Sequence, residues 1–427
     1  MGLFFCQDDN QAIINMLTIE GNIVGDNKPK RGRIEIDTDT GLISKISSPT
    51  GRADILLKDE LVFPGFIDIH VHARECADHS QDYKEDFLTA GMAGINGGVT
   101  AMAEMPNNPT PPIDDASYET KKTLTDKCPI EVFLYAGIGP NTKPLSKKVP
   151  YKAFMGPSVG DLFFHSKEEL EETIKSYTGQ YVSFHCENPL ILEQNKNQPT
   201  HELQRPPEAE TSAVDFAIEL IKKYSLHGKV CHCSTLASLE KVVSAKKEGV
   251  DITVEITPHH LYFDEEMLNK ENIGWLQVNP PIRQSGADRL KLIELLKNGD
   301  IDYLATDHAP HTIEEKEKGT SGMPHLDTYA PFASWLASEH SFTPAEIARV
   351  CSQNPGEFLN NFSLNKYGKI EEGYVGSLTI MNIQKPVTIK KDTLKTKCGW
   401  SPFEVITFPG CVTMSIVKGK VYKNENN

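Results

Sequence analysis

Residues 63–72 read Phe-Pro-Gly-Phe-Ile-Asp-Ile-His-Val-His. This is a short, nearly continuous apolar run, and such a run is typical of a strand that is buried on both faces. The run ends in two histidines spaced two residues apart. Residues two apart in a strand point to the same side, so His70 and His72 can face one metal ion. The stretch therefore predicts a buried strand with a metal site at its carboxyl end.

Similar apolar runs recur through the middle of the chain, at residues 99–105, 132–138, 151–155, 182–186, 230–233, 252–257 and 301–306. Helix-like segments separate most of them, for example residues 166–176, 210–224 and 287–297. Apolar strands that alternate with helices indicate a parallel sheet covered on both faces. Eight such strands over about 240 residues are typical of a closed (β/α)₈, or TIM, barrel. The fold class is therefore predicted to be α/β.

Both ends of the chain have a different pattern, in which apolar and polar residues alternate. It occurs at residues 16–20, 32–37 and 42–46, and again at 376–381, 411–417 and 419–422. Alternation of this kind indicates half-buried strands. We expect a small β-sandwich domain built from both termini, residues 1–61 plus 366–427. The metal-dependent catalytic barrel is expected at residues 62–365.

The composition argues against several classes of partner. Lys and Arg total 44 against 59 Asp and Glu, a formal net charge of −15, which argues against a nucleic-acid partner. No run of 18 apolar residues is present, so no membrane span is expected. The nine cysteines form no regular framework, and the first residues lack the basic segment of a secretory signal. We therefore expect a cytoplasmic protein with reduced thiols and a small-molecule substrate.

Further polar residues fall at the other predicted strand ends. They are Lys152, His185, His232 and Asp307. The active site of a TIM barrel lies at the carboxyl ends of its strands. A single histidine in such a place is more often structural than a ligand. Four histidines and one aspartate at strand ends of one barrel favour a metal centre instead.

Lys152 needs a separate explanation, because an ammonium group repels a divalent cation. Two metal ions about 3.5–4 Å apart need a bridging anion. A lysine amine that has reacted with carbon dioxide becomes a carbamate, whose two oxygens can each ligate one ion. Taken alone, Lys152 is as well explained as a solvated surface lysine, and the residues leave both interpretations open.

From Val62 to about Val421 the chain resembles the amidohydrolase superfamily and, within it, the dihydroorotases. The stretches that carry the resemblance are 63–74, 84–87 (Lys-Glu-Asp-Phe), 97–100, 105–108 (Met-Pro-Asn-Asn), 185–187, 230–235, 257–261, 279–283, 305–311 (Ala-Thr-Asp-His-Ala-Pro-His) and 400–404. Arg74 and the two segments 84–87 and 105–107 are similar to dihydroorotases in particular. One departure is His325, which stands where that family usually has glycine.

The resemblance implies two zinc ions per chain, bridged by carboxylated Lys152 and a hydroxide. It implies these further ligands: His70 and His72 for the more buried zinc, His185 and His232 for the second, and Asp307 as a ligand that also shuttles a proton. It implies that the substrate carboxylate is held by Arg74, Asn107 and His311, with Asn279 beside the pyrimidine ring. The implied reaction is the reversible cyclisation of N-carbamoyl-L-aspartate to L-dihydroorotate in pyrimidine biosynthesis.

Two alternatives remain open at this point. An allantoinase or a dihydropyrimidinase (hydantoinase)-like enzyme would use the same metals, but its substrates lack the ring carboxylate and would leave Arg74 without an obvious purpose. A non-catalytic scaffold of the same fold would be expected to have lost ligands, whereas all six are present here. The sequence does not decide the oligomeric state, and a homodimer is compatible with it.

Overall fold

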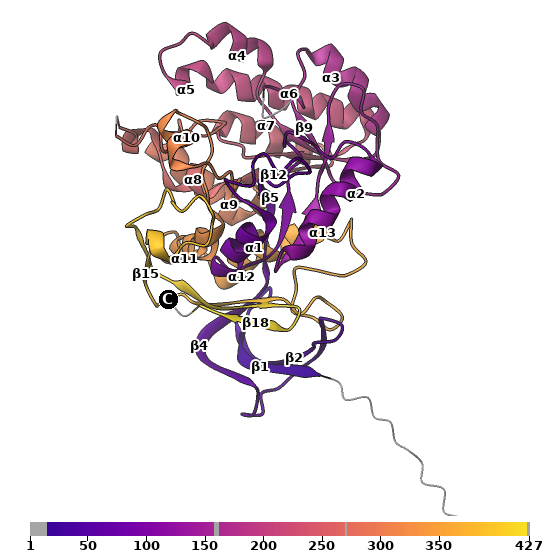
Figure 1. The fold of residues 1–427 in the computed structure, drawn as a ribbon. Coiled ribbons are helices and arrows are strands. Elements are labelled where there is room, and N and C mark those ends of the chain that lie inside the picture. The colour runs from indigo at the N-terminus through magenta and orange to yellow at the C-terminus, as the bar shows by residue number, and fades with distance from the viewer. Residues whose placement is uncertain (1–14, 158–161, 270, 425–427) are drawn as a thin grey trace, which may run out of the picture.

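The computed structural model describes residues 15–157, 162–269 and 271–424. Residues 1–14 and 425–427 of the two predicted terminal segments lie outside the described residues. A helical and parallel-stranded body forms the larger part of the molecule, and a small β-sheet layer lies at one end of it (Figure 1). None of the helices in the described part of the chain is long and apolar enough to cross a membrane.

The body is a closed barrel of parallel strands. Its strands are β5 (Phe66–Val71), β6 (Val99–Glu104), β7 (Glu131–Leu134) with β8 (Ala136–Ile138), β9 (Tyr151–Phe154), β10 (Tyr181–His185), β11 (His227–Val230), β12 (Ile252–Ile256) and β13 (Tyr303–Leu304). Each strand pairs in parallel with the next one along the chain. A parallel bridge between Val71 and His308 closes the ring, with the His72 amide donating to the His308 carbonyl at 2.8 Å. The predicted TIM barrel is confirmed.

One predicted strand is divided in two. The run from Phe63 to His72 was expected to be continuous, but β4 (Ile55–Pro64) and β5 belong to different sheets. Gly65 lies between them, and a Cβ at this position would lie 2.1 Å from the Thr100 hydroxyl oxygen. The close approach requires glycine, and the chain passes through this point from the terminal sheet into the barrel.

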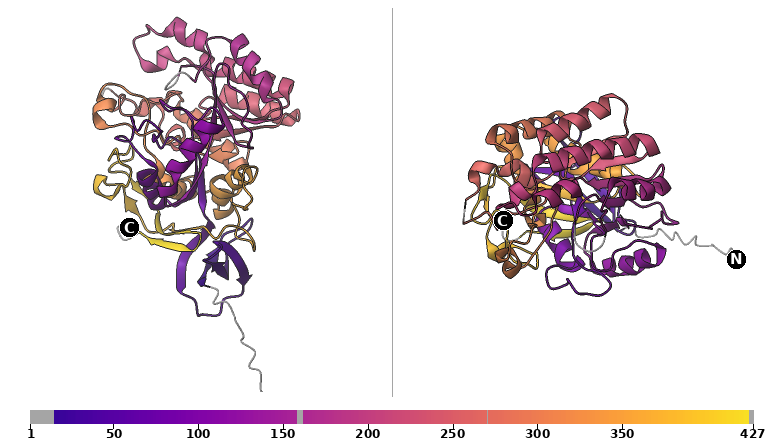
Figure 2. Two further views of the ribbon diagram at one scale, coloured as in Figure 1. Left: turned by 45° about the vertical axis from the view of Figure 1, so that its right-hand side comes forward. Right: turned by 90° about the horizontal axis from the view of Figure 1, so that it is seen from above.

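The helices form an outer layer around the strands (Figure 2). The longer ones are α1 (Phe87–Asn96), α2 (Asp115–Leu124), α3 (Lys167–Ile174), α6 (Pro207–Tyr224), α7 (Leu236–Lys247), α9 (Gly286–Asn298) and α11 (Tyr329–Glu339). The shorter ones are α4 (Pro189–Asn195), α5 (His201–Gln204), α8 (Pro258–Tyr262), α10 (Ile313–Glu317), α12 (Pro344–Ala348) and α13 (Asn354–Leu359). Most begin at a side chain that accepts from a first-turn amide, as Asp86 does before α1 and Ser285 before α9. The three predicted helices correspond to α3, α6 and α9.

Strands from both ends of the chain form one mixed sheet. Its members are β1 (Met16–Ile23), β2 (Lys30–Asp37), β3 (Leu42–Ser47), β4, β14 (Leu378–Asn382), β17 (Cys411–Val417) and β18 (Lys420–Lys423), in the order β18-β17-β14-β4-β1-β2-β3. The central strand β4 pairs in parallel with β1 and antiparallel with β14, so it joins the two ends of the chain. A separate pair consists of β15 (Val387–Thr388) and β16 (Thr407–Phe408). The exact domain boundaries stay a prediction.

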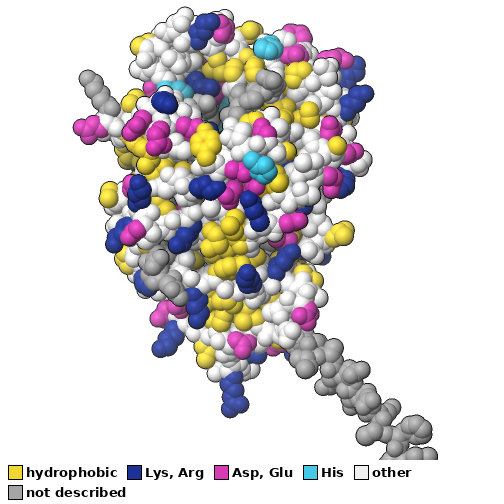
Figure 3. Space-filling view, viewed as in Figure 1, with side chains coloured by type: hydrophobic (Ala, Val, Ile, Leu, Met, Phe, Trp, Pro, Cys, Tyr) yellow, Lys and Arg dark blue, Asp and Glu magenta, His cyan; other side chains and the backbone are white. Residues whose placement is uncertain are grey.

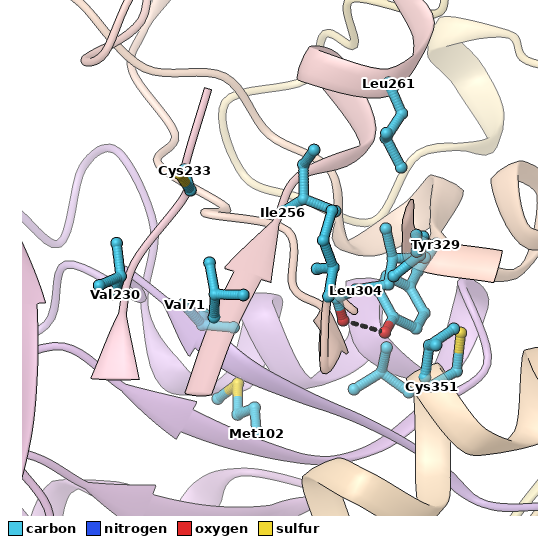
Figure 4. Close-up of a cluster of buried hydrophobic side chains, with 14 of the residues drawn as sticks. Val71, Met102, Val230, Cys233, Ile256, Leu261, Leu304, Tyr329 and Cys351 are labelled. Atoms are coloured by element: carbon cyan, nitrogen blue, oxygen red, sulfur yellow. Dashed lines mark hydrogen bonds between the residues drawn. The ribbon is translucent and has the colours of Figure 1, made fainter. Parts of the chain in front are cut away.

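Apolar side chains fill the space between the barrel strands and the helices beside them. Figure 4 shows Val71, Ile256 and Leu304 from three strands of the barrel, next to Tyr329 at the start of α11. The Tyr329 hydroxyl donates to the Leu304 carbonyl at 2.6 Å, which satisfies a polar group inside an apolar environment. Burial of each such side chain stabilises the fold by about 1.5–3 kcal/mol. This packing holds the strand ends, and therefore the polar residues they carry, in fixed positions.

Candidate active site

A cavity of about 330 Å³ lies at the carboxyl ends of the barrel strands. The predicted site residues that line it are His70, His72, Arg74, Asn107, His185, His232, Asn279, Asp307 and His311. The remaining one, Lys152, does not line the cavity and is fully buried on β9. The structure therefore brings nine of the ten predicted residues to one cavity, from segments that are far apart in the sequence.

His70, His72 and Asp307 form one group of ligand atoms. The Nε2 atoms of His70 and His72 lie 3.3 Å and 3.0 Å from the same carboxylate oxygen of Asp307. The Nε2 atom of His70 is buried and has no hydrogen-bond partner among the described residues. A buried ring nitrogen without a hydrogen-bond partner, close to a carboxylate, is the arrangement expected of two metal ligands.

His185 and His232 form a second group. His185 Nδ1 lies 2.9 Å from His232 Nε2, so the two rings present nitrogens to the same point. His185 uses its other nitrogen, Nε2, for a contact of 2.9 Å to the Glu187 carboxylate. Glu187 is fully buried and is also paired with Arg205. If Nε2 carries the proton, Nδ1 is left with the lone pair that a metal needs.

Glu255 on β12 supports the first group in a similar way. Its carboxylate contacts His70 Nδ1, accepts from the His232 amide at 3.2 Å and is paired with Lys229. A carboxylate behind a histidine fixes its tautomer and raises its basicity as a ligand. Glu255 and Glu187 were not among the residues predicted from the sequence. The available signals were a charged residue inside the apolar run 252–257 and a carboxylate two residues after His185.

Protonation states in the cavity suit metal binding. Burial lowers the pKa of His70 and His232 well below the usual range. The rings are therefore neutral near pH 7, which is the form that ligates. Burial also raises the pKa of Asp307 to about 7, so this carboxyl can both lose and accept a proton near neutral pH. Nitrogen and carboxylate donors are the set that zinc takes, and the residues present fit such a centre.

Lys152 is fully buried, and its amine lies 2.7 Å from the thiol of Cys231. The interpretation of this residue as a solvated surface lysine is therefore wrong. Its neighbour Cys231 also forms a group with His70 and Glu255 in which one ligand atom of each lies within 4.8 Å of the others. Carboxylation of Lys152 remains a prediction.

A cationic group lies at another side of the cavity. Arg74 is 2% exposed, and its Nη2 donates to His311 Nε2 at 3.1 Å while its Nε donates to the Pro310 carbonyl at 3.2 Å. On the far side of His311, Nδ1 lies 3.1 Å from Glu315, which also pairs with Lys84 at 3.0 Å. Burial and the charges of Arg74 and Lys84 lower the pKa of His311 to about 2, so its ring is neutral. The group carries two cations and one anion, which favours an anionic ligand.

His325, the departure from the family pattern, does not line the cavity. It is 1% exposed, and its Nε2 lies 3.0 Å from His259 Nδ1 with the two rings stacked. The cavity wall in this region consists of Thr320, Ser321 and Gly322 instead.

Comparison with known proteins identifies the family of the chain. Residues 61–422 match the model of the amidohydrolase family. The chain is 32% identical to the dihydroorotase of Pyrococcus furiosus over 96% of this chain and 93% of that protein. It is 33% identical to the dihydroorotase of Thermococcus kodakarensis over 94% and 92%. Among solved structures, the L-hydantoinase (dihydropyrimidinase) of Arthrobacter aurescens has the same fold, with a TM-score of 0.86 and 23% identity over 96% of both chains. The chain therefore belongs to the amidohydrolase family and is a hydrolase of that family.

Proposed function

We propose that this enzyme is a dihydroorotase, which interconverts N-carbamoyl-L-aspartate and L-dihydroorotate in pyrimidine biosynthesis. The observation that carries the proposal is the buried guanidinium of Arg74 in the wall of a cavity that also contains the histidine groups. A buried cation is costly unless it is paired. A substrate with a carboxylate on its ring supplies that pair, and L-dihydroorotate is such a substrate. The dihydroorotases to which the chain is 30–33% identical support the same conclusion.

The rival substrates fit this cavity less well. Hydantoins, dihydropyrimidines and allantoin lack a ring carboxylate, so they would bring no anionic partner to Arg74, whereas Lys84 is already paired with Glu315. The likeness to the hydantoinase structure, at 23% identity, concerns the fold alone. A non-catalytic scaffold is disfavoured because the ligand-type residues are all present and converge on the cavity or beside it.

We assign the metal centre to His70, His72, Lys152 in its carboxylated form, His185, His232 and Asp307. Bound zinc ions at such a centre supply a water that loses its proton near neutral pH and polarise the carbonyl that is attacked. The protein contributes neutral imidazoles, which do not have to lose a proton before they ligate. Glu255 and Glu187 hold two of these rings in position.

Asp307 moves the proton of the reaction. In hydrolysis its carboxylate accepts the proton of the attacking water and then donates it to the ring nitrogen as the amide C–N bond breaks. In the direction of ring closure the same group removes the proton from the carbamoyl nitrogen. Arg74 holds the carboxylate with its planar pair of N–H donors, with Asn107 and His311 beside it.

The decisive experiment compares the rates of hydrolysis of L-dihydroorotate, allantoin and dihydrouracil by the zinc-loaded enzyme. We expect kcat/KM for dihydroorotate to exceed the others by about 100-fold or more, because only this substrate pairs with the buried cation. A higher kcat/KM for either uncharged substrate would refute the proposal. Absence of zinc from protein prepared with the metal, together with no turnover, would favour the scaffold.

A further inference from the structure

Lys316 in α10 has an unusual environment for a lysine. It is 1% exposed, and its ammonium donates to three backbone carbonyls, those of Gln277 at 3.2 Å, Thr320 at 2.7 Å and Gly322 at 3.0 Å. The ring of Trp400 lies 5.7 Å from the Nζ atom. Among the described residues Lys316 makes no ion pair with a carboxylate. Burial lowers the pKa of this amine to about 7, and in the protonated form its three N–H donors match the three carbonyls.

These carbonyls come from two segments of the cavity wall. Thr320 and Gly322, with Ser321 between them, line the cavity. Gln277 lies two residues before Asn279, which lines it as well. Without Lys316, the carbonyls of Thr320 and Gly322 would lack this donor inside the protein, whereas the Gln277 carbonyl would keep the Gly322 amide as its donor. Lys316 therefore adds a connection between the segment 320–322 and the segment 277–279 from the side of α10.

The side chain of Gln277 strengthens the same connection. Its amide nitrogen donates to the Gly319 carbonyl at 2.6 Å and to the Ser321 hydroxyl at 3.1 Å. The Gly322 amide donates in turn to the Gln277 carbonyl at 2.9 Å. On the other side the wall is in tight contact with the anion site, since a Cβ at Gly322 would lie 2.6 Å from the Ala309 carbonyl oxygen and 3.0 Å from the His311 ring. A displacement of the wall would therefore disturb His311.

We propose that Lys316 is a positioning residue for substrate binding. It fixes the wall segment 320–322 against the segment 277–279 and so sets the shape of the cavity around the substrate ring. It does not touch the reacting atoms. The inference rests on the proposed function for the identity of the substrate, but the role of Lys316 in holding the wall does not depend on it.

The test uses the variants Lys316→Met, which keeps the long stem without donors, and Lys316→Arg, which keeps the charge and the donors. Lys318→Met is the matched control, because Lys318 is exposed and lies two residues further along. The measurements are KM and kcat for dihydroorotate, zinc content, and hydrogen–deuterium exchange of the segment 319–323. For Lys316→Met we expect a KM about tenfold higher, a smaller change in kcat, unchanged zinc content and faster exchange of the segment. Lys316→Arg should recover part of the loss, and Lys318→Met should behave as wild type.

Unchanged KM and unchanged exchange in Lys316→Met would overturn the inference, as would equal effects in Lys318→Met. If Lys316→Met does not fold, Lys316→Gln keeps a polar side chain with fewer donors, and unchanged KM and exchange in that variant overturn the inference too. Wild-type protein that does not hydrolyse dihydroorotate would refute the proposed function instead. Exchange of the segment 319–323 would then still decide whether Lys316 holds the wall.

Discussion

Arg74 is the residue whose chemistry best separates the candidate substrates. Its guanidinium is buried, its backbone is in the left-handed region with a φ of 67°, and His311 and the Pro310 carbonyl orient it. A non-glycine residue in that conformation at a cavity wall is a feature that the surrounding structure has to hold in place. The side chain is therefore presented to the cavity in a fixed direction.

Replacement of Arg74 with Met should reduce activity on dihydroorotate selectively. Loss of a charge-assisted contact to the substrate carboxylate costs about 2–5 kcal/mol in transition-state binding, or roughly 30- to several-thousand-fold in kcat/KM. Zinc content should be unchanged, and any activity on dihydrouracil should barely change. The measurement is kcat/KM for both substrates in wild type and variant. Equal losses on both substrates would show that Arg74 has a structural role.

Replacement of Lys152 tests whether its carboxylated side chain is the anion that bridges the two metal ions. We expect Lys152→Ala to lose most of the binuclear centre, because two dications in close contact need an anion between them. Mass spectrometry under mild conditions should show an added carbon dioxide on the wild-type lysine, and metal analysis should show the loss in the variant. A free amine at Lys152 in protein that binds both metals would contradict the prediction.

The pKa of the Asp307 carboxyl leads to a prediction of how metal affinity depends on pH. Its pKa in the metal-free protein is about 7, so below this pH a proton occupies the carboxylate that the metal needs. Metal affinity should therefore rise with pH up to about 7 and level off above it. His70 and His232 contribute little to this rise, because their pKa values are already far below the range. Titration of metal binding between about pH 5.5 and 8.5 should show a weaker dependence in Asp307→Asn. An unchanged slope in that variant would rule out Asp307 as the source.

At the scale of secondary-structure elements, β12 connects the two histidine groups. Its Glu255 contacts the ring of His70 at the end of β5 and the backbone of His232 just after β11. His70 and Glu255 are 185 positions apart in the sequence, and the register of the barrel strands brings them into contact. One carboxylate on one strand therefore orients ligands that two other strands carry.

Glu255→Gln should weaken metal binding, and it should also lower the melting temperature because the buried Lys229 loses its charged partner. Gln keeps the size of the side chain but cannot act as the charged acceptor for His70, and loss of such a supporting carboxylate costs about 10–100-fold in metal affinity. Competition with a chromogenic chelator measures the affinity. Glu240→Gln, at an exposed position on α7, is the matched control and should leave it unchanged. Equal affinities in wild type and Glu255→Gln would mean that His70 needs no such support.

At the scale of the whole molecule, the fold and the metal centre are separate sources of stability. The barrel core is apolar and continuous, whereas the site is a polar cavity at one end of it. Acidic and basic side chains are interspersed on the face shown in Figure 3, which fits a small-molecule substrate better than a polyanion. The protein should therefore keep its fold when the metals are removed.

We expect carefully loaded protein to contain two metal ions per chain. A chelator should remove them, abolish activity and lower the melting temperature by several degrees, since ligands that bind only the folded state stabilise it by mass action. The far-ultraviolet circular dichroism should stay unchanged, and zinc should restore activity. One ion per chain at full activity, or loss of the helical signal with the metal, would contradict this expectation.

The sequence by itself determined the barrel and the identity of most residues in the cavity. A buried parallel strand corresponds to a local apolar run in the sequence. A residue at the end of such a run lies at the carboxyl end of the barrel, independently of the other segments. For this reason His70, His72, His185, His232 and Asp307 could be predicted together. Arg74 and His311 came from resemblance, because nothing local in their segments predicts that they meet.

Only the tertiary structure decided which polar groups support these residues. The supporting residues Glu255, Glu187 and Lys316 contact partners from other strands or loops. The sequence alone does not distinguish a buried charged residue that orients a metal ligand from one that only forms an ion pair. The burial of Lys152, the turn of His325 away from the cavity and the division of residues 63–72 at Gly65 were also settled there. The physical reason is that each depends on contacts between distant segments, such as the 237 positions between Arg74 and His311, which exist only when the barrel has closed.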